Sequence, residues 1–291
     1  MTFVAGQTSN TPAENATSDG KATPAEEFLE RVRQELQKHR SIKAEMSQVV
    51  SIGDQQFKIT GEYLSSGLKL RLKYTIDSAQ GVQGEMLEVC DGKELSTLLQ
   101  VMDSPPSVTQ RNVQQILEAA AAASNQKVPE ATLNGELGMG GLTTLLASLS
   151  RNMTFDAMKA DESNGHSVTM IQGRWKKERI AGVQKEGGDG LPPFFPDLVQ
   201  IHVNSKTLFP EKIHYLKKQV QNSKSQGPKK SLKALLSLEF RDVGFDGPVD
   251  DDTFLFLVPP KVIPVDVTKQ YLDRLTAPVS TPPAASVPAQ N

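Results

Sequence analysis

The chain has 291 residues, of which 37% are hydrophobic and 23% charged, so it is long enough to bury a substantial core. Its 32 basic and 34 acidic side chains give a formal net charge of −2, without the basic excess that nucleic-acid binding requires, and we expect no nucleic-acid partner. The single cysteine, Cys90, excludes a disulfide within the chain and a metal site built from cysteines. No apolar run reaches the roughly 18 residues that a membrane-spanning helix needs.

The two ends of the chain are poor in large apolar side chains. Residues 1–24 are mostly Thr, Ser, Asn, Ala and Gly, and residues 276–291 are mostly Pro, Ala and Ser. Such segments bury too little apolar surface to offset the entropy of ordering, so we predict that both ends are disordered. The expected folded domain comprises residues 25–275.

A helix and a series of strands open this domain. Thr23 and Pro24 are typical of a capped helix start. The apolar stripe that follows at helical spacing consists of Phe28, Leu29, Val32 and Leu36. After His39 apolar and polar residues alternate, and turn signals separate four predicted strands at 42–47, 57–63, 68–76 and 86–90. Strands joined by tight turns form an antiparallel meander.

The middle of the chain is expected to be helical. Ser107 is expected to cap a helix that runs to about Ala123, and glycine-rich residues 135–141 lead into a second, largely apolar helix at 142–149. Strand patterns then resume at 153–158, 167–175, 198–204, 212–218, 232–241 and 253–257. This order predicts an α+β fold that is mostly β, with helices inserted into one antiparallel sheet rather than a βαβ arrangement.

Three stretches of this pattern resemble the LolA-like family of periplasmic lipoprotein carriers and lipid-binding proteins. Residues 42–48 (IKAEMSQ), after the opening helix, are similar to the family's first strand, and residues 88–95 (EVCDGKEL) are similar to its Asp-Gly-Lys hairpin. Residues 252–266 (DTFLFLVPPKVIPVD) are similar to its closing strand, although Ile263 stands where glycine is usual. The resemblance covers about residues 26 to 270.

The resemblance implies a strongly curved antiparallel sheet, an unclosed half-barrel, with an N-terminal helix and a helical lid at about residues 105–151. An apolar inner face would bind acyl chains of a lipid or lipoprotein, without a cofactor, a metal or enzymatic activity, in the periplasm or another exported location. We expect the cavity to be lined by Phe57, Ile59, Leu70, Leu72, Phe254 and Phe256. We expect it to be covered by the lid residues Leu142, Leu145, Leu146 and Leu149. A register slip of one residue would exchange the two faces of a strand.

One departure from the family keeps a second hypothesis open. In the carriers an arginine before a proline, early in the third strand, holds the lid closed, whereas the matching place here is residues 65–67 (SSG). The insert at 182–196 has no obvious counterpart either. The alternative function is therefore an envelope sensor or protein-binding scaffold that uses the same fold without lipid transfer. We expect a monomer, with a membrane surface or an envelope protein as a further partner. A cytoplasmic location also stays open, because residues 1–7 show no secretory signal.

Residues capable of chemistry do not form a recognised catalytic or metal-binding motif. The acidic residues Asp246 and 250–252 do not match a calcium-binding loop, and residues 138–141 lack the Lys-Ser/Thr of a phosphate loop, so we interpret them as a turn and a hinge. Cys90 is expected to be a small buried hydrophobe. No pair of histidines has the spacing of a zinc-binding helix, although two of them lie on neighbouring predicted strands and could face each other. The histidines are His39, His166, His202 and His214.

Two surface features each permit a structural and a functional interpretation. Lysines crowd one predicted hairpin, which is either a solvated turn or a contact for anionic headgroups. These lysines are Lys224, Lys229, Lys230 and Lys233. Residues 191–196 (LPPFFP) place two adjacent phenylalanines in a proline-rich loop. They either plug the core or form a tip that touches a membrane or partner.

Overall fold

The computed structural model describes residues 22–53, 55–78, 81–123, 140–163, 165–180, 191–223 and 227–276. The expected disordered ends, apart from residues 22–24 and 276, therefore lie outside the described residues. So do Lys224 and most of the glycine-rich stretch and of the insert at 182–196. Among the described residues, no helix is long and apolar enough to cross a membrane.

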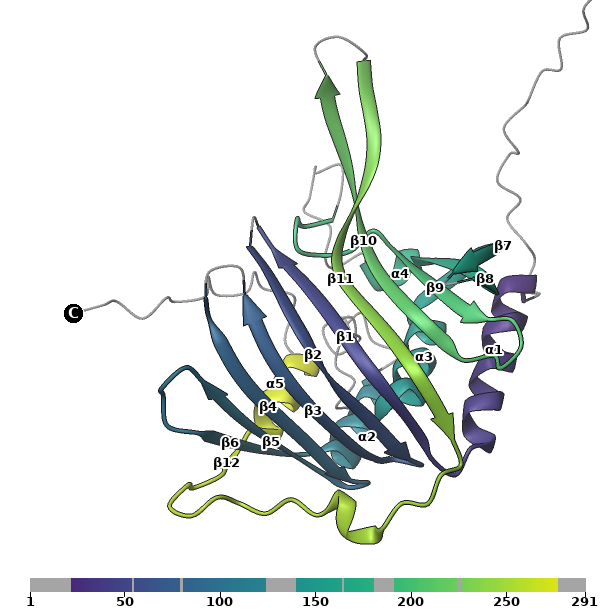
Figure 1. The fold of residues 1–291 in the computed structure, drawn as a ribbon. Coiled ribbons are helices and arrows are strands. Elements are labelled where there is room, and N and C mark those ends of the chain that lie inside the picture. The colour runs from purple at the N-terminus through teal and green to yellow at the C-terminus, as the bar shows by residue number, and fades with distance from the viewer. Residues whose placement is uncertain are drawn as a thin grey trace, which may run out of the picture.

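Twelve strands form one sheet in the order β12-β6-β5-β4-β3-β2-β1-β11-β10-β9-β8-β7 (Figure 1). The first six are β1 (Ile42–Ile52), β2 (Gln55–Ser66), β3 (Lys69–Ser78), β4 (Gln83–Asp91), β5 (Glu94–Val101) and β6 (Ser107–Asn112). The others are β7 (Met153–Ser163), β8 (His166–Trp175), β9 (Leu198–Asn204), β10 (Pro210–Ser223), β11 (Gly227–Phe245) and β12 (Val265–Asp266). The short pairing of β12 with β6 is parallel. The other pairings among the described strands are antiparallel.

Two meanders meet at the centre of this sheet. Strands β1 to β6 follow one another outward on one side, and β11 back to β7 follow one another outward on the other, because β1 pairs with β11. The chain must therefore cross from the edge at β6 to the opposite edge at β7. The described parts of that crossing are two helices, α2 (Val113–Ala123) and α3 (Gly141–Asn152).

β-Bulges bend the sheet around the helices. The β1–β11 register shifts between Lys43 and Glu45, and opposite this shift Asp242 adopts a left-handed φ of 50°. Further shifts lie in β7, where Asp156 is the extra residue, and in β11, where Leu235 is the extra residue opposite Tyr215 and Leu216. An extra residue in one strand locally bends it and increases its twist. The result is a curved sheet whose two edges, β12 and β7, do not pair, which confirms the predicted unclosed half-barrel.

Helices pack on the inner face of the sheet (Figure 1). Helix α1 (Pro24–Lys38) begins with a capping box, in which the Thr23 hydroxyl accepts a hydrogen bond from the Glu26 amide and the Glu26 carboxylate accepts one from the Thr23 amide. It contacts α3 and β7, while α2 contacts α5 (Thr268–Thr276). The predicted stripe on α1, including Leu29 and Val32, is buried in the main core.

Two predicted elements are wrong. The helix expected from Ser107 begins only at Val113, because residues 107–112 form β6 and pair with both β5 and β12. Asn112 rather than Ser107 caps the helix, since its side-chain oxygen accepts a hydrogen bond from the Gln115 amide. The strand expected at 253–257 is absent: Asp251–Phe254 is a short 3-10 helix, and extended residues without sheet pairing follow it.

Candidate functional site

The predicted cavity floor is occupied by the predicted lid. Leu70 and Leu72 lie on the inner face and are fully buried. The N-terminus of α3 sits against them, because a Cβ added at Gly141 would lie 3.5 Å from Leu70 Cδ1 and 2.7 Å from the Tyr63 hydroxyl. Only a residue without a side chain fits there, and the left-handed φ of 71° also favours glycine.

The lid leucines pack firmly into the half-barrel. Leu142, Leu145, Leu146 and Leu149 are all buried in the core. The Tyr63 hydroxyl accepts a hydrogen bond of 3.2 Å from the Leu142 amide, one of the unpaired amides at the start of α3. Burial raises the pKa of Tyr63, so this hydroxyl stays protonated. In this conformation α3 therefore fills the space against the inner face of the sheet, and the Tyr63 side chain of β2 binds its N-terminus.

Two further predicted cavity residues lie farther along the same face. Phe57 and Ile59 share the inner face of β2 with Tyr63 and are half-buried, and Ile59 packs against the core. Toward this end of the strands the described helices cover the inner face less completely. Among the described residues, the inner face is therefore least covered near Phe57 and the β1–β2 turn, and we call this region the open end of the half-barrel.

The last two predicted cavity residues do not share that face, which corrects the sequence interpretation. Phe254 is buried beneath the C-terminal segment, and the Lys69 ammonium lies 5.8 Å from its ring centroid. Lys69 alternates with Leu70, so Phe254 lies against the outer face of the sheet. Phe256, two residues later, is half-buried in the extended segment. The closing segment crosses the outside of the sheet instead of adding a strand whose side chains point inward.

An apolar pocket of about 830 Å³ lies at the open end of the half-barrel. Its floor is inner-face residues of three neighbouring strands, Val50, Tyr215 and Leu236, where Leu236 pairs with both of the others. Its opposite wall is Trp175 and the proline-rich loop, with Leu191, Pro193, Phe194 and Pro196. Sites of this volume with mostly apolar walls are typical of small-ligand binding.

The proline-rich loop is tightly anchored. Lys217 Nζ donates hydrogen bonds to the backbone oxygens of Leu191 (2.9 Å) and Phe195 (3.1 Å) and lies 3.0 Å from Asp197 Oδ1. The other oxygen of Asp197 accepts a hydrogen bond of 2.7 Å from the Lys218 amide. Trp175 Nε1 donates to the backbone oxygen of Pro196 at 2.8 Å. The loop is thus a rigid wall of the pocket, fixed to β8 and β10.

The two adjacent phenylalanines of this loop have different surroundings: one is buried in the core and the other is exposed. Phe195 is 8% exposed and packs against Trp175, with ring centroids 5.0 Å apart, so it plugs the core. Phe194 is 59% exposed and lines the pocket. Because the loop is anchored, Phe194 is presented to solvent at a fixed place beside the pocket.

The described rim of the pocket is basic. Its lining includes Lys217, Lys218 and Lys233, and no described lining residue is acidic. Lys217 is neutralised by Asp197, whereas Lys218 is exposed and Lys233 donates to the backbone oxygen of Gly53 at 2.9 Å. An apolar chamber with a cationic edge can hold a hydrocarbon chain and attract an anionic head.

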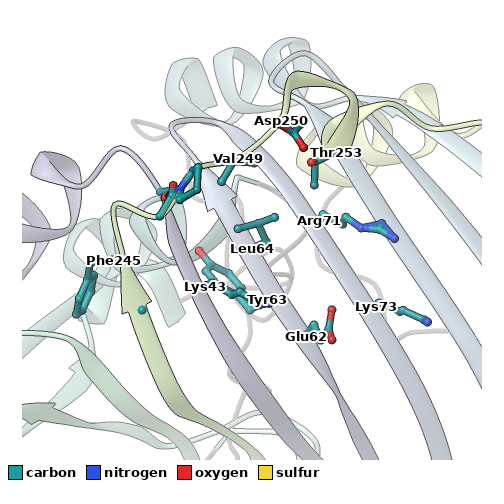
Figure 2. A pocket seen from close by; sticks show the side chains of 14 residues that line it. Lys43, Glu62, Tyr63, Leu64, Arg71, Lys73, Phe245, Val249, Asp250 and Thr253 are labelled. Carbon is teal, nitrogen blue, oxygen red and sulfur yellow. Dashed lines mark hydrogen bonds between the residues drawn. The ribbon is translucent and has the colours of Figure 1, made fainter.

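A second pocket, of about 410 Å³, lies on the outer face and has a different character (Figure 2). Outer-face side chains of β1 to β3, including Lys43, Glu62 and Arg71, line it together with Asp250 and Thr253 of the C-terminal segment. Charges of both signs share this shallow space with solvent. It is a poor match for an apolar ligand.

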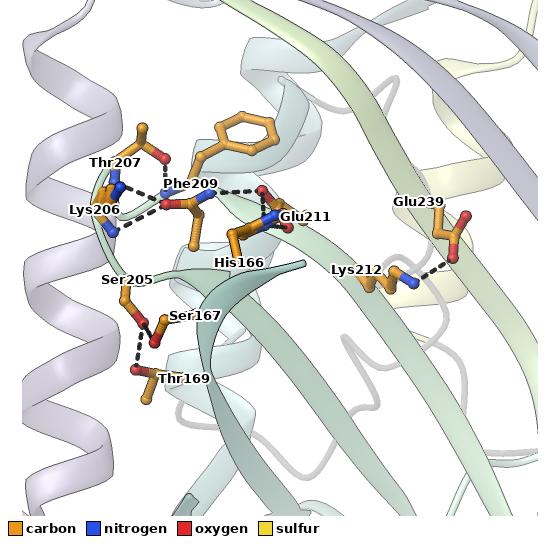
Figure 3. A network of polar contacts seen from close by, with 11 residues as sticks. His166, Ser167, Thr169, Ser205, Lys206, Thr207, Phe209, Glu211, Lys212 and Glu239 are labelled. Atoms are coloured by element: carbon orange, nitrogen blue, oxygen red, sulfur yellow. Dashed lines mark hydrogen bonds and ion pairs between the residues drawn. The ribbon is translucent and has the colours of Figure 1, made fainter. Parts of the chain in front are cut away.

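The polar clusters are structural. His166 Nε2 lies 2.8 Å from Glu211, and Asn204 donates to the same carboxylate, which ties the β7–β8 and β9–β10 turns together (Figure 3). His202 and His214 do face each other, with ring centroids 5.5 Å apart. Among the described residues, no group of three or more His, Cys, Asp or Glu is placed to hold a metal ion.

Asp246 and Cys90 also have structural surroundings. Asp246 Oδ1 accepts a hydrogen bond from the Arg40 amide at 2.7 Å, and its other oxygen lies 3.0 Å from His39 Nδ1. These bonds, that to His39 first, lower the pKa of Asp246. Cys90 is fully buried, and burial raises the pKa of its thiol, which makes it a poor nucleophile.

A buried arginine, Arg111, lies on the inner face of the sheet, but it contacts α5 and not the lid helix α3. Arg111 on β6 donates a hydrogen bond to the Tyr271 hydroxyl of α5 and lies over its ring, 4.7 Å from the centroid. Glu88 is 3.7 Å away on β4. The place that matches the carriers' arginine is the β2–β3 turn, and the contact with the lid is made by Tyr63 instead.

Several pocket residues are not indicated by the sequence. Trp175, Tyr215 and Lys217 all fall on predicted strands, and only the loop beside them has an unusual composition. Alternation marks Trp175 and Tyr215 as inward-facing, but the pocket joins residues from four strands, the β1–β2 turn and one loop that are far apart in the chain. No local pattern indicates that Lys217 binds this loop.

Comparisons with known proteins give only distant likenesses. No family model matches the sequence, and no curated protein matches it. A putative outer membrane lipoprotein-sorting protein domain from Vibrio parahaemolyticus is 12% identical, covering 79% of this chain and 97% of its own, with a TM-score of 0.33. The lipoprotein LppX of Mycobacterium tuberculosis is 10% identical, with coverages of 78% and 98% and a TM-score of 0.37. MucB, in complex with MucA(peri), is 10% identical, with coverages of 82% and 66% and a TM-score of 0.30. Likenesses this weak show no function, and only the geometry of this chain can support one.

Proposed function

We propose that this chain is a non-enzymatic binding protein whose pocket at the open end of the half-barrel takes an acyl chain of a lipid or lipidated protein. The observation that carries the proposal is the pocket of about 830 Å³ with an apolar floor, Val50 and Leu236, an aromatic wall at Trp175 and a lysine rim. A hydrocarbon chain suits the walls, and an anionic or polar head suits the rim.

The energetics favour a hydrocarbon ligand. Each methylene group moved from water into an apolar site contributes about 0.8 kcal/mol, so eight of them contribute roughly 6 kcal/mol. Burying a charged group among the same walls would instead cost free energy. The fixed proline-rich loop reduces the ordering cost of binding, because one wall of the pocket already has its bound position.

Trp175, the single tryptophan of the chain, allows a direct test. Fatty acids brominated along the chain quench tryptophan emission at contact range, so we expect saturable quenching of Trp175. Leu236→Gln places an amide in the pocket floor and should weaken this quenching. Leu87→Gln, at a half-buried position on the outer face of β4, is the matched control and should leave quenching unchanged.

Native mass spectrometry before and after organic extraction tests the same proposal on the protein as purified. Co-purifying acyl species that are lost on extraction would support it. A ligand-free mass together with no quenching by any brominated acyl chain would contradict it. That result would favour the alternative, a protein-binding scaffold or sensor with a filled core.

The proposal includes the periplasmic or exported location that the sequence resemblance implies. It is tested by fractionating cells that express the full-length coding region. Recovery of the protein in the cytoplasm alone would contradict the proposed location. It would not test acyl-chain binding, which the two experiments above measure.

A further inference from the structure

The segment that forms β10 and the first part of β11 has an unusual charge pattern. Residues 212–238 contain seven lysines but no arginine, aspartate or glutamate, in a chain whose formal net charge is −2. Glu211 and Glu239 flank this run, and Lys212 and Lys217 are paired with Glu239 and Asp197, so the excess positive charge of the hairpin comes from its other five lysines. The two described strands of this hairpin continue to pair up to Ser223 and Gly227.

This hairpin extends past its neighbours in the sheet. Pairing of β9 with β10 ends at Leu216, and pairing of β1 with β11 ends at Leu236. Beyond these points β10 and β11 pair only with each other, and the ribbon rises clear of the sheet (Figure 1). Lys229 and Lys230 lie on this ribbon by their backbone pairing with Gln221 and Val220. Lys218 and Lys233 lie at its base, on the pocket rim.

Exposed apolar side chains accompany Lys218 and Lys233 at the base of the ribbon. Phe194, on the anchored loop, is 59% exposed and lines the same pocket. Leu232, the strand partner of Lys218, is 48% exposed. Large apolar groups next to lysines on one surface are the composition of elements that lie in a membrane interface.

We propose that the basic ribbon and Phe194 dock this protein on an anionic phospholipid bilayer, with the pocket opening toward the membrane. Lysine is a compact, strongly hydrated point charge that suits diffuse attraction to a charged surface. Protein interfaces are instead enriched in arginine and depleted in lysine, and arginine is absent from residues 212–238. Phe194 adds an apolar anchor at a fixed position.

Docking on a bilayer is a property separate from the ligand that the pocket binds. Its test is co-sedimentation of the full chain with vesicles of phosphatidylcholine alone or mixed with phosphatidylglycerol. We expect binding to the mixed vesicles only, weakening as salt is raised, because salt screens surface attraction. Each lysine near the surface is worth about fivefold in affinity, so Lys218→Gln/Lys229→Gln/Lys230→Gln should lose about a hundredfold. Phe194→Ser should lose about tenfold.

Two control variants make the same kinds of substitution, with the same change in charge, elsewhere on the surface. Lys159→Gln/Lys206→Gln/Lys261→Gln removes the same charge at three exposed positions outside the pocket, and Leu257→Ser removes an apolar side chain that is 86% exposed on the C-terminal segment. Both should bind vesicles as the parent does. Unchanged far-ultraviolet circular dichroism in every variant shows that the fold is intact.

The possible failures are distinguishable. Absence of binding to mixed vesicles, or equal losses in the test and control variants, would overturn docking even if brominated acyl chains still quench Trp175. Binding to a polyglutamate peptide without binding to vesicles would also overturn it, in favour of an acidic protein partner. Vesicle binding without any acyl uptake would support docking and remove the proposed function instead.

Discussion

Replacing Lys217 by glutamine tests whether one buried cation holds the wall of the pocket. Lys217 bonds two backbone oxygens of the proline-rich loop and the Asp197 carboxylate, and the two side chains are only 15% and 17% exposed. In Lys217→Gln the carboxylate keeps the Lys218 amide but loses its counter-charge. Breaking a buried pair costs about 3–5 kcal/mol. With the remaining amide bond and partial exposure, we expect a loss of about 2–3 kcal/mol in the free energy of unfolding.

Lys212→Gln is the matched control on the same strand. Lys212 lies 2.8 Å from Glu239, a pair with side chains 22% and 25% exposed, but Glu239 also accepts a hydrogen bond from Arg241 at 2.9 Å. Losing one of two partners at a more exposed site should cost about 1 kcal/mol or less. Urea unfolding with the linear extrapolation gives both values.

Trp175 fluorescence reports on the loop itself. Because the Trp175 indole bonds Pro196 and packs on Phe195, release of the loop in Lys217→Gln should shift its emission to longer wavelength and increase quenching by acrylamide. Lys217→Gln/Asp197→Asn should recover part of the lost stability, since no unpaired buried charge remains. Equal stability of the Lys217 and Lys212 variants, with unchanged emission, would refute the reasoning.

Three further outcomes are expected. Leu146→Ala opens a cavity in the core and should cost about 2–5 kcal/mol in urea unfolding, whereas Leu255→Ala, at an exposed position, should cost almost nothing; similar costs would mean that α3 does not plug the inner face. Gly141→Ala should destabilise the fold and increase protease cleavage near α3, because an added Cβ meets a tyrosine hydroxyl at 2.7 Å; resistance equal to that of the parent would contradict this contact. Burial lowers the pKa of His202 and of His214 in the folded state, so the unfolded chain takes up protons first as pH falls through about 6.5, and stability should decrease as the pH is lowered through that value. His202→Asn/His214→Asn should flatten that dependence in urea unfolding, and an unaltered slope would assign it to other groups.

Elements whose burial pattern is local could be predicted from the sequence. The helix after Thr23 has its cap, proline and apolar stripe within fifteen residues, and α1 spans Pro24–Lys38. The strand pattern in residues 198–204, which alternates from Val199 onward, predicts a strand, and β9 has these same bounds. The apolar residues at 142–149 predict a buried helix, and α3 is buried on most of its length. These patterns are informative because each element carries its own periodicity.

Elements whose conformation depends on a partner could not be predicted. Residues 107–112 begin with a residue that favours helix caps and carry little apolar alternation, yet they become β6 because β5 and β12 supply their backbone hydrogen bonds. Residues 253–257 alternate like a strand, but Asp251–Phe254 forms a 3-10 helix and Phe254 is buried against the outer face instead. The periodicity of apolar residues indicates which side chains are buried, but it does not indicate which helix, strand or loop packs against them.

The candidate site shows the same division. An antiparallel sheet with one apolar face, an unusual Phe194-Phe195 loop and a hairpin rich in lysine are all evident in the order of the residues, and the half-barrel is implied by the resemblance. The burial of Phe195 and the exposure of Phe194 depend on the folded chain, because adjacent identical side chains differ only in what packs against them. The position of the pocket, beside Trp175 rather than above Leu70, also depends on packing, since α3 fills the inner face at Leu70 and Lys217 fixes the loop over the open end. The pocket is formed by segments that are far apart in the chain, and these segments come together only when the sheet curves around the helices.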